Sequence, residues 1–341
     1  MKNATAVMAL AYLIVCWGVD GKATASRPLG GYQPVSDVSQ HARMSVDVCE
    51  INTLLDARPI DFAAIGVIYS RGRHSIESNG SMRTFRQFAS GARSKEQLLS
   101  RYERQLGSGW LHSFASAAIE GTGPFAGETD LVRRQGVQKA VRDQMLVAWT
   151  FHELDAAVDK ATREDFATDT GAPHNWDEAR AYYHGEKPEC APYATAEERG
   201  VQFGTGPAIN QGILAAMHRG LTALQARNAT GAARARDEVI RYITITYTQS
   251  AIKYAADMDS ALAQGKPNDA RIWQAEGWAY FRVIEPLVSE VSPGAAQAVT
   301  GVFDLGTQPS EGASEKVARA LAEAYTPLKI HASEVGRYSP R

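Results

Sequence analysis

Cysteine and net charge are both scarce in this chain. Only three of its 341 residues are Cys, and 36 Lys and Arg against 38 Asp and Glu leave a formal net charge of -2. So little cysteine excludes a small disulfide-stapled scaffold, and the near balance of charge argues against a nucleic-acid-binding protein, which normally carries a basic surface. The remaining composition, 44% hydrophobic and 22% charged, is ordinary for a globular protein with a substantial core.

Complete catalytic motifs are also lacking. The run His152-Glu153-Leu154-Asp155-Ala156 begins like the H-E-x-x-H of zinc proteases, but Ala156 stands where the second His is needed. The glycines at 121, 123 and 127 follow no recognisable strand, and Pro124 interrupts them where a dinucleotide loop needs backbone donors. We therefore expect no enzymatic activity, with an exported metallopeptidase as the enzyme alternative.

Long apolar runs are limited to one stretch of 14 residues, Ala6 to Val19. It follows Lys2 and precedes Ala23-Thr24-Ala25, which is typical of a signal peptide over residues 1–25, cleaved after Ala25. A membrane anchor is one alternative, although about 20 residues are needed to span a bilayer. A lipoprotein attached through Cys16 is another, with Val15 where a small residue is usual. We expect a periplasmic or extracellular protein that is not integral to the membrane.

Cleavage would leave two cysteines, Cys49 and Cys190. In an oxidising compartment the simplest prediction is one disulfide between them. The closed loop of about 140 residues would contribute roughly 4 to 5 kcal/mol by the chain-entropy argument. A reactive thiol or a thiolate metal ligand is the alternative, but neither cysteine lies in a C-x-x-C motif or beside a Cys/His cluster.

Helical periodicity dominates the rest of the chain. Apolar residues recur at steps of three and four within residues 130–162 and again from Ile240 to Leu262, which predicts two long helices. Pro267 opens a further helix that Pro286 kinks or ends. Shorter helices are predicted over 43–56, 61–71, 94–106, 176–184, 207–227 and 314–325. The fold class is therefore all-α, a multi-helix bundle with two or more long central helices packed by several short ones.

The domain organisation follows from the same pattern. Residues 26–40 carry Gly, Pro and Ser without periodicity and predict a flexible N-terminal arm. Residues 41–330 form a single helical domain, and residues 331–341 a C-terminal tail. Two pseudo-repeats remain an alternative, because Asp61, Asp177 and Asp269 each begin a predicted helix and each is followed by an aromatic residue. Acidic capping residues followed by core-facing apolar residues would produce the same similarity without a repeat.

Clusters of oxygen and imidazole donors are the remaining chemical signal. The candidate metal ligands are His152, Glu153 and Asp155 on one helix turn, His174, Asp177 and Glu178 around a helix start, and the single carboxylate of Glu276. Such donors suit iron if they converge in space. Each group has a non-metal alternative. His152 would be a core histidine, Asp177 and Glu178 would be acids that the helix dipole favours near a helix N-terminus, and Glu276 would be a solvent-exposed carboxylate.

Five stretches of the chain resemble one known family. They are residues 61–75, 174–206, 209–221, 243–259 and 265–288, and the most specific element is Cys-Ala-Pro-Tyr at 190–193 with Asp-Glu-Ala upstream at 177–179. Together they resemble the algal iron-assimilation proteins, also called low-iron-inducible periplasmic proteins, which have bacterial relatives.

The resemblance implies an exported, mostly helical protein that assists iron acquisition outside the plasma membrane and has no known enzymatic activity. It supplies no ligand set. Combined with the donor clusters, it predicts a protein that binds ferrous or ferric iron or passes it to a membrane transporter or receptor, with the region from His152 to Asp155 as the expected site. The alternative is a non-catalytic structural or receptor-docking protein.

Overall fold

The computed structural model describes residues 27–339, which form helices and no β-strand. The helices are α1 (Ser39–Ala42), α2 (Met44–Asp56), α3 (Phe62–Arg71), α4 (Phe85–Ala89), α5 (Leu99–Leu106), α6 (Trp110–Glu120), η1 (Gly123–Phe125), α7 (Asp130–Lys139), η2 (Ala140–Met145), α8 (Leu146–Thr162), α9 (Ala172–His184), η3 (Pro188–Cys190), α10 (Pro192–Phe203), α11 (Ala208–Gln225), α12 (Ala229–Ala263), α13 (Pro267–Phe281), α14 (Glu285–Val291), α15 (Pro293–Phe303), α16 (Ala313–Tyr325) and α17 (Ala332–Val335). The predicted all-α fold class is confirmed.

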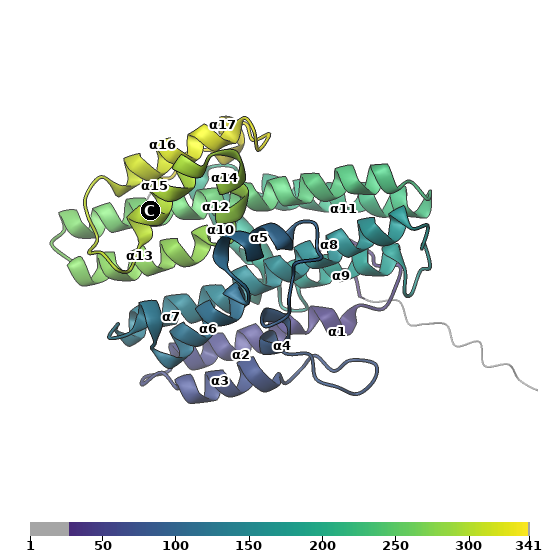
Figure 1. The fold of residues 1–341 in the computed structure, drawn as a ribbon, viewed down its shortest axis with the longest axis horizontal. Coiled ribbons are helices and arrows are strands. Elements are labelled where there is room, and N and C mark those ends of the chain that lie inside the picture. Colours follow the sequence, from purple (N-terminus) through teal and green to yellow (C-terminus); the bar gives the residue numbers. More distant parts are fainter. Residues whose placement is uncertain (1–26, 340–341) are drawn as a thin grey trace, which may run out of the picture.

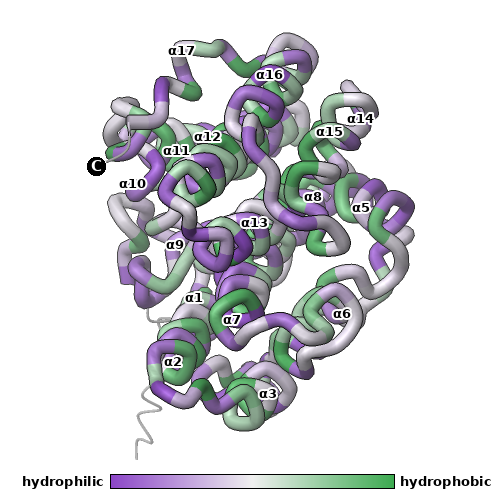
Figure 2. The backbone as a smooth tube through the Cα atoms, turned by 90° about the vertical axis from the view of Figure 1, so that its left-hand side faces the viewer, coloured by the Kyte–Doolittle hydropathy of each residue, from purple (hydrophilic) through white to green (hydrophobic). Residues whose placement is uncertain are grey.

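Helix α12, with 35 residues, runs through the middle of the bundle and packs against α11, α13 and α16. In Figure 1 the N-terminal helices α1 to α4 lie along one edge and α16 and α17 along the opposite edge. Figure 2 shows several of the long helices end-on, with α13 between these two edges. The N-terminal helices thus form one edge of the bundle, the long helices its centre, and the C-terminal helices the opposite edge.

The helix predicted over residues 130–162 is present as α7, η2 and α8 in one continuous run. Its middle segment, η2, is a π-helical turn in which all six residues are buried. A π turn inserts an extra residue per turn and re-aims the side chains that follow it. Apolar periodicity predicted the helix, but it carried no sign of the π turn.

Helix α12 is confirmed and extends beyond the expected stripe. Helix α13 starts at Pro267 as predicted but ends at Phe281, and Pro286 lies in the first turn of α14 instead of kinking or ending α13. The prediction missed α6, α10 and α15, as well as the short helices α1, α4 and α17. Of the 11 residues of α6, seven are buried, so no single apolar stripe stands out. Both α10 and α15 begin with a proline, Pro192 and Pro293, at a position where proline favours a helix start.

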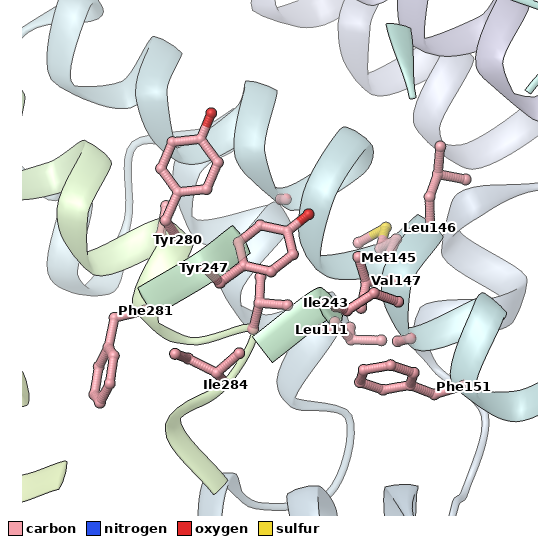
Figure 3. Packing of buried hydrophobic residues seen from close by; sticks show 14 of the residues in the cluster. Leu111, Met145, Leu146, Val147, Phe151, Ile243, Tyr247, Tyr280, Phe281 and Ile284 are labelled. Atoms are coloured by element: carbon pink, nitrogen blue, oxygen red, sulfur yellow. The ribbon is translucent and has the colours of Figure 1, made fainter. Parts of the chain in front are cut away.

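The core joins these long helices through large apolar side chains. Figure 3 shows Met145 and Phe151 of the η2–α8 run near Ile243 and Tyr247 of α12, with Tyr280 of α13 beside them. All five are buried. Burial of such side chains contributes roughly 1.5 to 3 kcal/mol each, which is why the long helices form the rigid centre.

The segment expected to be a flexible arm is packed instead. Tyr32 and Val38 are fully buried, and α1 already begins at Ser39. The expected tail is ordered in the same way, because α17 lies within it and Glu334 pairs with Arg241 at 2.8 Å. Composition indicated irregular backbone in the arm, but buried side chains hold that backbone in place.

The predicted disulfide is confirmed, and it joins Cys49 of α2 to Cys190 of η3. The signal peptide predicted over residues 1–25 lies outside the described residues. Within residues 27–339, no helix combines the length and apolar character that a membrane crossing requires.

Candidate metal centre

Helices α8 and α9 pack along each other and bring the two predicted donor groups together. Glu153 of α8 and Glu178 of α9 share one partner, the Asn175 amide, whose Nδ2 donates to Glu153 Oε2 at 2.6 Å and to Glu178 Oε2 at 3.1 Å. All three side chains are buried. Residues 25 positions apart in the sequence thus form a single site.

Histidines surround this carboxyl pair. Glu178 Oε1 lies 2.9 Å from Nε2 of His41 on α1 and 3.0 Å from Nε2 of His174 on α9. The other ring nitrogen of His174, Nδ1, lies 2.9 Å from Ser36 Oγ, and this contact fixes the orientation of the ring. Two imidazoles therefore converge on one carboxylate oxygen.

A second imidazole–carboxylate contact continues the site towards solvent. His152 Nδ1 lies 3.0 Å from Glu96 Oε2, and His152 Nε2 lies 4.0 Å from Glu153 Oε1. The His152 side chain is 32% exposed and that of His174 20%, so the site reaches the surface at these two rings. We call the six residues His41, Glu96, His152, Glu153, His174 and Glu178 the His/Glu cluster.

Several buried polar atoms in and beside the cluster have no hydrogen-bond partner. They are His41 Nδ1, Glu96 Oε2, His152 Nδ1 and Asn175 Oδ1. Glu96 Oε2 and His152 Nδ1 face each other at 3.0 Å, yet neither makes an aligned hydrogen bond. Buried polar atoms are almost always paired in folded proteins, so such a concentration needs an explanation.

The two carboxyl groups at the centre titrate in opposite directions. Burial, together with the neighbouring Glu178 charge, raises the pKa of Glu153 well above its usual value. Burial also acts to raise the pKa of Glu178, but its contacts with His174 and His41 outweigh that effect and lower it. A proton shared by the pair is therefore favoured on Glu153, and the negative charge on Glu178.

His41 occupies a conflicting position. Its Nε2 lies 2.9 Å from Arg83 Nη2 and also 2.9 Å from Glu178 Oε1. An imidazole nitrogen cannot accept from the guanidinium and donate to the carboxylate at the same time. Burial lowers the pKa of His41, which favours the neutral ring that accepts from Arg83. When Nε2 accepts from Arg83 it cannot donate to Glu178, so only one of these two hydrogen bonds of His41 forms at a time.

As they stand, the donors touch each other and do not surround a space. Within the described residues 27–339, no group of three or more His, Cys, Asp or Glu side chains is placed to hold a metal ion. Two ligands about 2.1 Å from one ion and at right angles to each other lie about 3 Å apart. The nitrogen–oxygen separations of 2.9 to 3.0 Å in the cluster equal that spacing. The same separations are ordinary for hydrogen bonds, so a cation could enter only by displacing protons and moving side chains.

The other three predicted ligands lie outside the cluster and have partners of their own. Asp155 accepts from the backbone N of Leu98 at 2.7 Å and pairs with Arg236 at 3.2 Å. Glu276 is buried against Lys139 Nζ at 2.6 Å, so the solvent-exposed alternative for this carboxylate is wrong.

Asp177 anchors the N-terminal arm. Its Oδ1 accepts from Tyr32 OH at 2.6 Å, and its Oδ2 accepts from the backbone N of Val35 at 2.8 Å and from both Ser36 N and Ser36 Oγ at 2.9 Å. Four donors saturate this carboxylate. Helix geometry explains the separation from Glu178, because adjacent residues on a helix point in different directions.

Sequence reasoning missed His41, Glu96, Asn175 and Arg83. Periodicity gave no signal for them: His41 follows directly after the supposed arm, and Glu96, expected inside the helix over 94–106, lies in the turn before α5. Asn175 stood between two predicted ligands and could have been included as a third polar residue on that turn. Only the packing of α1 and the turn against α8 and α9 brings the others in.

The comparisons with known proteins agree with the resemblance noted in the sequence. No curated protein and no solved structure matches the chain. One family model matches residues 5–340, nearly the whole length, and it describes the low iron-inducible periplasmic proteins. The chain belongs to the low iron-inducible periplasmic protein family.

Proposed function

We propose that this exported protein assists iron acquisition by binding one iron ion at the His/Glu cluster. The observation that carries the proposal is the convergence of His41 and His174 on Glu178 Oε1, with the Glu153 carboxyl group tied to the same Asn175. Imidazole and carboxylate together suit iron, and the family is induced when iron is low.

Iron would bind by exchange for protons. The ligands expected to move least are Glu153, His174 and Glu178, because Asn175 and Ser36 already orient them. Glu153 must lose its proton before it can bind a cation, so binding releases protons and strengthens as pH rises. His41 completes the set once Arg83 releases its Nε2.

The exposed edge of the cluster is where iron would enter and leave. His152 and His174 are its two partly exposed rings, and both contact the buried carboxylates. We propose that iron passes across this edge to a membrane transporter or receptor.

The alternative, a docking protein without a metal, has less support. The large hydrophobic side chains exposed in the described part of the chain are Val67, Ile76, Leu131 and Val201. They lie on α3, in the loop that follows it, on α7 and on α10. No single one of these elements therefore presents an apolar face to a receptor.

Calorimetric titration of the metal-free protein with ferrous iron under nitrogen tests the proposal. We expect one site of micromolar affinity or tighter, with a heat that varies with the ionisation enthalpy of the buffer because protons are released. The double variant His174→Ala/Glu178→Gln should bind at least 100-fold more weakly.

The matched control is His112→Ala/Glu323→Gln, which removes one imidazole and one carboxylate outside the cluster and should leave binding unchanged. Absence of binding at micromolar iron, or equal loss in both double variants, would contradict the proposal. Ferric iron, added as a weak complex, tests the second oxidation state in the same way.

A further inference from the structure

A groove of about 760 Å³ runs between α12 on one side and α5 and α14 on the other. The loop at 327–329 also lines it, as do Leu98 and Asp155. A volume of this size is typical of a site for a small molecule. Its lining residues do not include any member of the His/Glu cluster.

The charges that line the groove leave an excess of cations. Each acidic residue in its wall has a basic partner: Asp155 and Asp237 pair with Arg236, Glu290 with Arg101, and Glu238 with Arg219. Two further lining cations, Arg234 and Lys329, have no ion-pair partner among residues 27–339. They stand on separate elements, α12 and the loop at 327–329. The lining holds five cationic and four acidic side chains, a net charge of +1, and Arg236 pairs with two of the carboxylates. An anion in the groove would meet this excess at Arg234 and Lys329.

Part of the groove lining is apolar. Ile240 of α12, Leu287 and Val291 of α14, and Leu328 form this part. Such a surface accommodates the carbon skeleton of an organic ligand better than a fully hydrated inorganic ion. Two separated cations and an apolar wall fit a small molecule that carries more than one carboxylate.

Two lining residues of the groove, Asp155 and Leu98, lie near members of the His/Glu cluster. Asp155 lies one turn after His152 on α8, and Leu98, which donates to Asp155, lies two residues after Glu96. The Glu96 charge acts on Asp155, so the two carboxylates lie within electrostatic range of each other. A ligand in the groove would therefore lie close to the exposed edge of the cluster.

We propose that this groove binds a small polycarboxylate anion of the citrate type, the class of ligand that chelates iron through hard oxygen donors. The groove would present iron, chelated by the anion, to the His/Glu cluster, and this role rests on the proposed function. Binding of the iron-free anion does not rest on it. Arg234 and Lys329 contact the carboxylates, and the apolar wall contacts the carbon skeleton.

Titration of the metal-free protein with citrate tests this inference. We expect one site, at least tenfold weaker binding in Arg234→Gln/Lys329→Gln, and no loss in Arg319→Gln/Lys316→Gln, which removes one exposed Arg and one exposed Lys from α16. Acetate and inorganic phosphate should bind at least tenfold more weakly than citrate.

No citrate binding at 1 mM, equal weakening in both double variants, or phosphate binding as tight as citrate would each overturn the inference. The cluster variant His174→Ala/Glu178→Gln separates the two proposals. If it still binds citrate, the groove is confirmed independently of iron. If citrate binds but free iron does not bind the unmodified protein, the proposed function fails while the groove remains.

Discussion

Two buried groups of charged residues in the described part of the chain differ in how completely their polar atoms are paired. The first surrounds η2 in the centre of the bundle. There Lys139 Nζ lies 2.6 Å from Glu276 Oε1, and Arg142 Nε lies 3.0 Å from Asp143 Oδ2. The second is the His/Glu cluster at the edge formed by α1, α8 and α9.

Hydrogen bonds complete the central network. Asp143 Oδ1 accepts from Thr195 Oγ1 at 2.7 Å and from Tyr247 OH at 3.0 Å, while Arg142 Nη2 donates to Tyr280 OH at 2.7 Å. None of these side chains has a buried atom without a partner. A closed network of this kind fixes the positions of α7, α12 and α13 and offers a ligand no unsatisfied group.

The His/Glu cluster is incomplete by comparison. It holds buried nitrogen and oxygen atoms without partners, a Glu153 carboxyl group whose pKa is raised by burial, and a histidine nitrogen between a guanidinium and a carboxylate. The comparison teaches that burial of charge does not by itself indicate function. The group whose atoms remain unpaired is the one in which an added cation gains new interactions.

The largest effect should come from breaking the central network. Glu276→Gln leaves the Lys139 ammonium buried without a countercharge, so the free energy of unfolding should fall by about 3 to 5 kcal/mol. Urea unfolding measures this loss, and iron binding by the folded protein should not change. Replacement of both partners, Lys139→Met/Glu276→Leu, should restore most of the stability. An equal loss in the double variant would show that the ion pair itself stabilises the core.

A smaller loss is expected where the arm is anchored. Asp177→Asn weakens the hydrogen bonds from Tyr32, Val35 and Ser36, and we expect a loss of about 1 to 3 kcal/mol. Because Ser36 also orients His174, iron affinity should fall as well. Limited proteolysis should cleave residues 27–38 faster than in the unmodified protein. Unchanged proteolysis would show that the arm is held by its apolar contacts alone.

A gain in stability is expected at the cluster. Because the pKa of Glu153 is higher in the folded than in the unfolded protein, the folded state holds more protons, and stability falls as pH rises from the usual glutamate pKa through the raised one. Glu153→Gln keeps an oxygen for Asn175 and removes the titration. The variant should be more stable than the unmodified protein at pH 8, by about 1 kcal/mol, with a smaller difference at pH 5.

Thermal unfolding at the two pH values measures this gain, and calorimetry should show that the same variant has lost iron affinity. Higher stability together with weaker iron binding in Glu153→Gln would identify Glu153 as a functional residue. Loss of stability at both pH values would make the cluster a structural network like the central one.

The smallest effect is expected at an exposed ion pair, which sets the baseline for the other variants. Arg319 and Glu315 pair on α16 with side chains 70% and 78% exposed. Arg319→Ala should therefore change the free energy of unfolding by no more than about 0.5 kcal/mol. A larger change in the free energy of urea unfolding would mean that the changes expected for the other charge substitutions are also too small.

Much of the fold could be predicted from the sequence because its signals are local. Apolar steps of three and four predicted the long helix over 130–162 and the one that continues to Leu262, and two cysteines in an exported chain predicted the bond between α2 and η3. The π turn at Ala140–Met145 had no local signal, because it arises where buried Arg142 and Asp143 meet groups from α10, α12 and α13.

The candidate site was only half predictable. The sequence by itself determined that acids and histidines are concentrated on two helix turns, at 152–155 and 174–178. Only the tertiary structure decided that His152, Glu153, His174 and Glu178 share one site, while Asp155 and Asp177 bind other partners. The physical reason is that helix periodicity sets the face on which a residue lies, whereas the packing of neighbouring helices sets what that face meets.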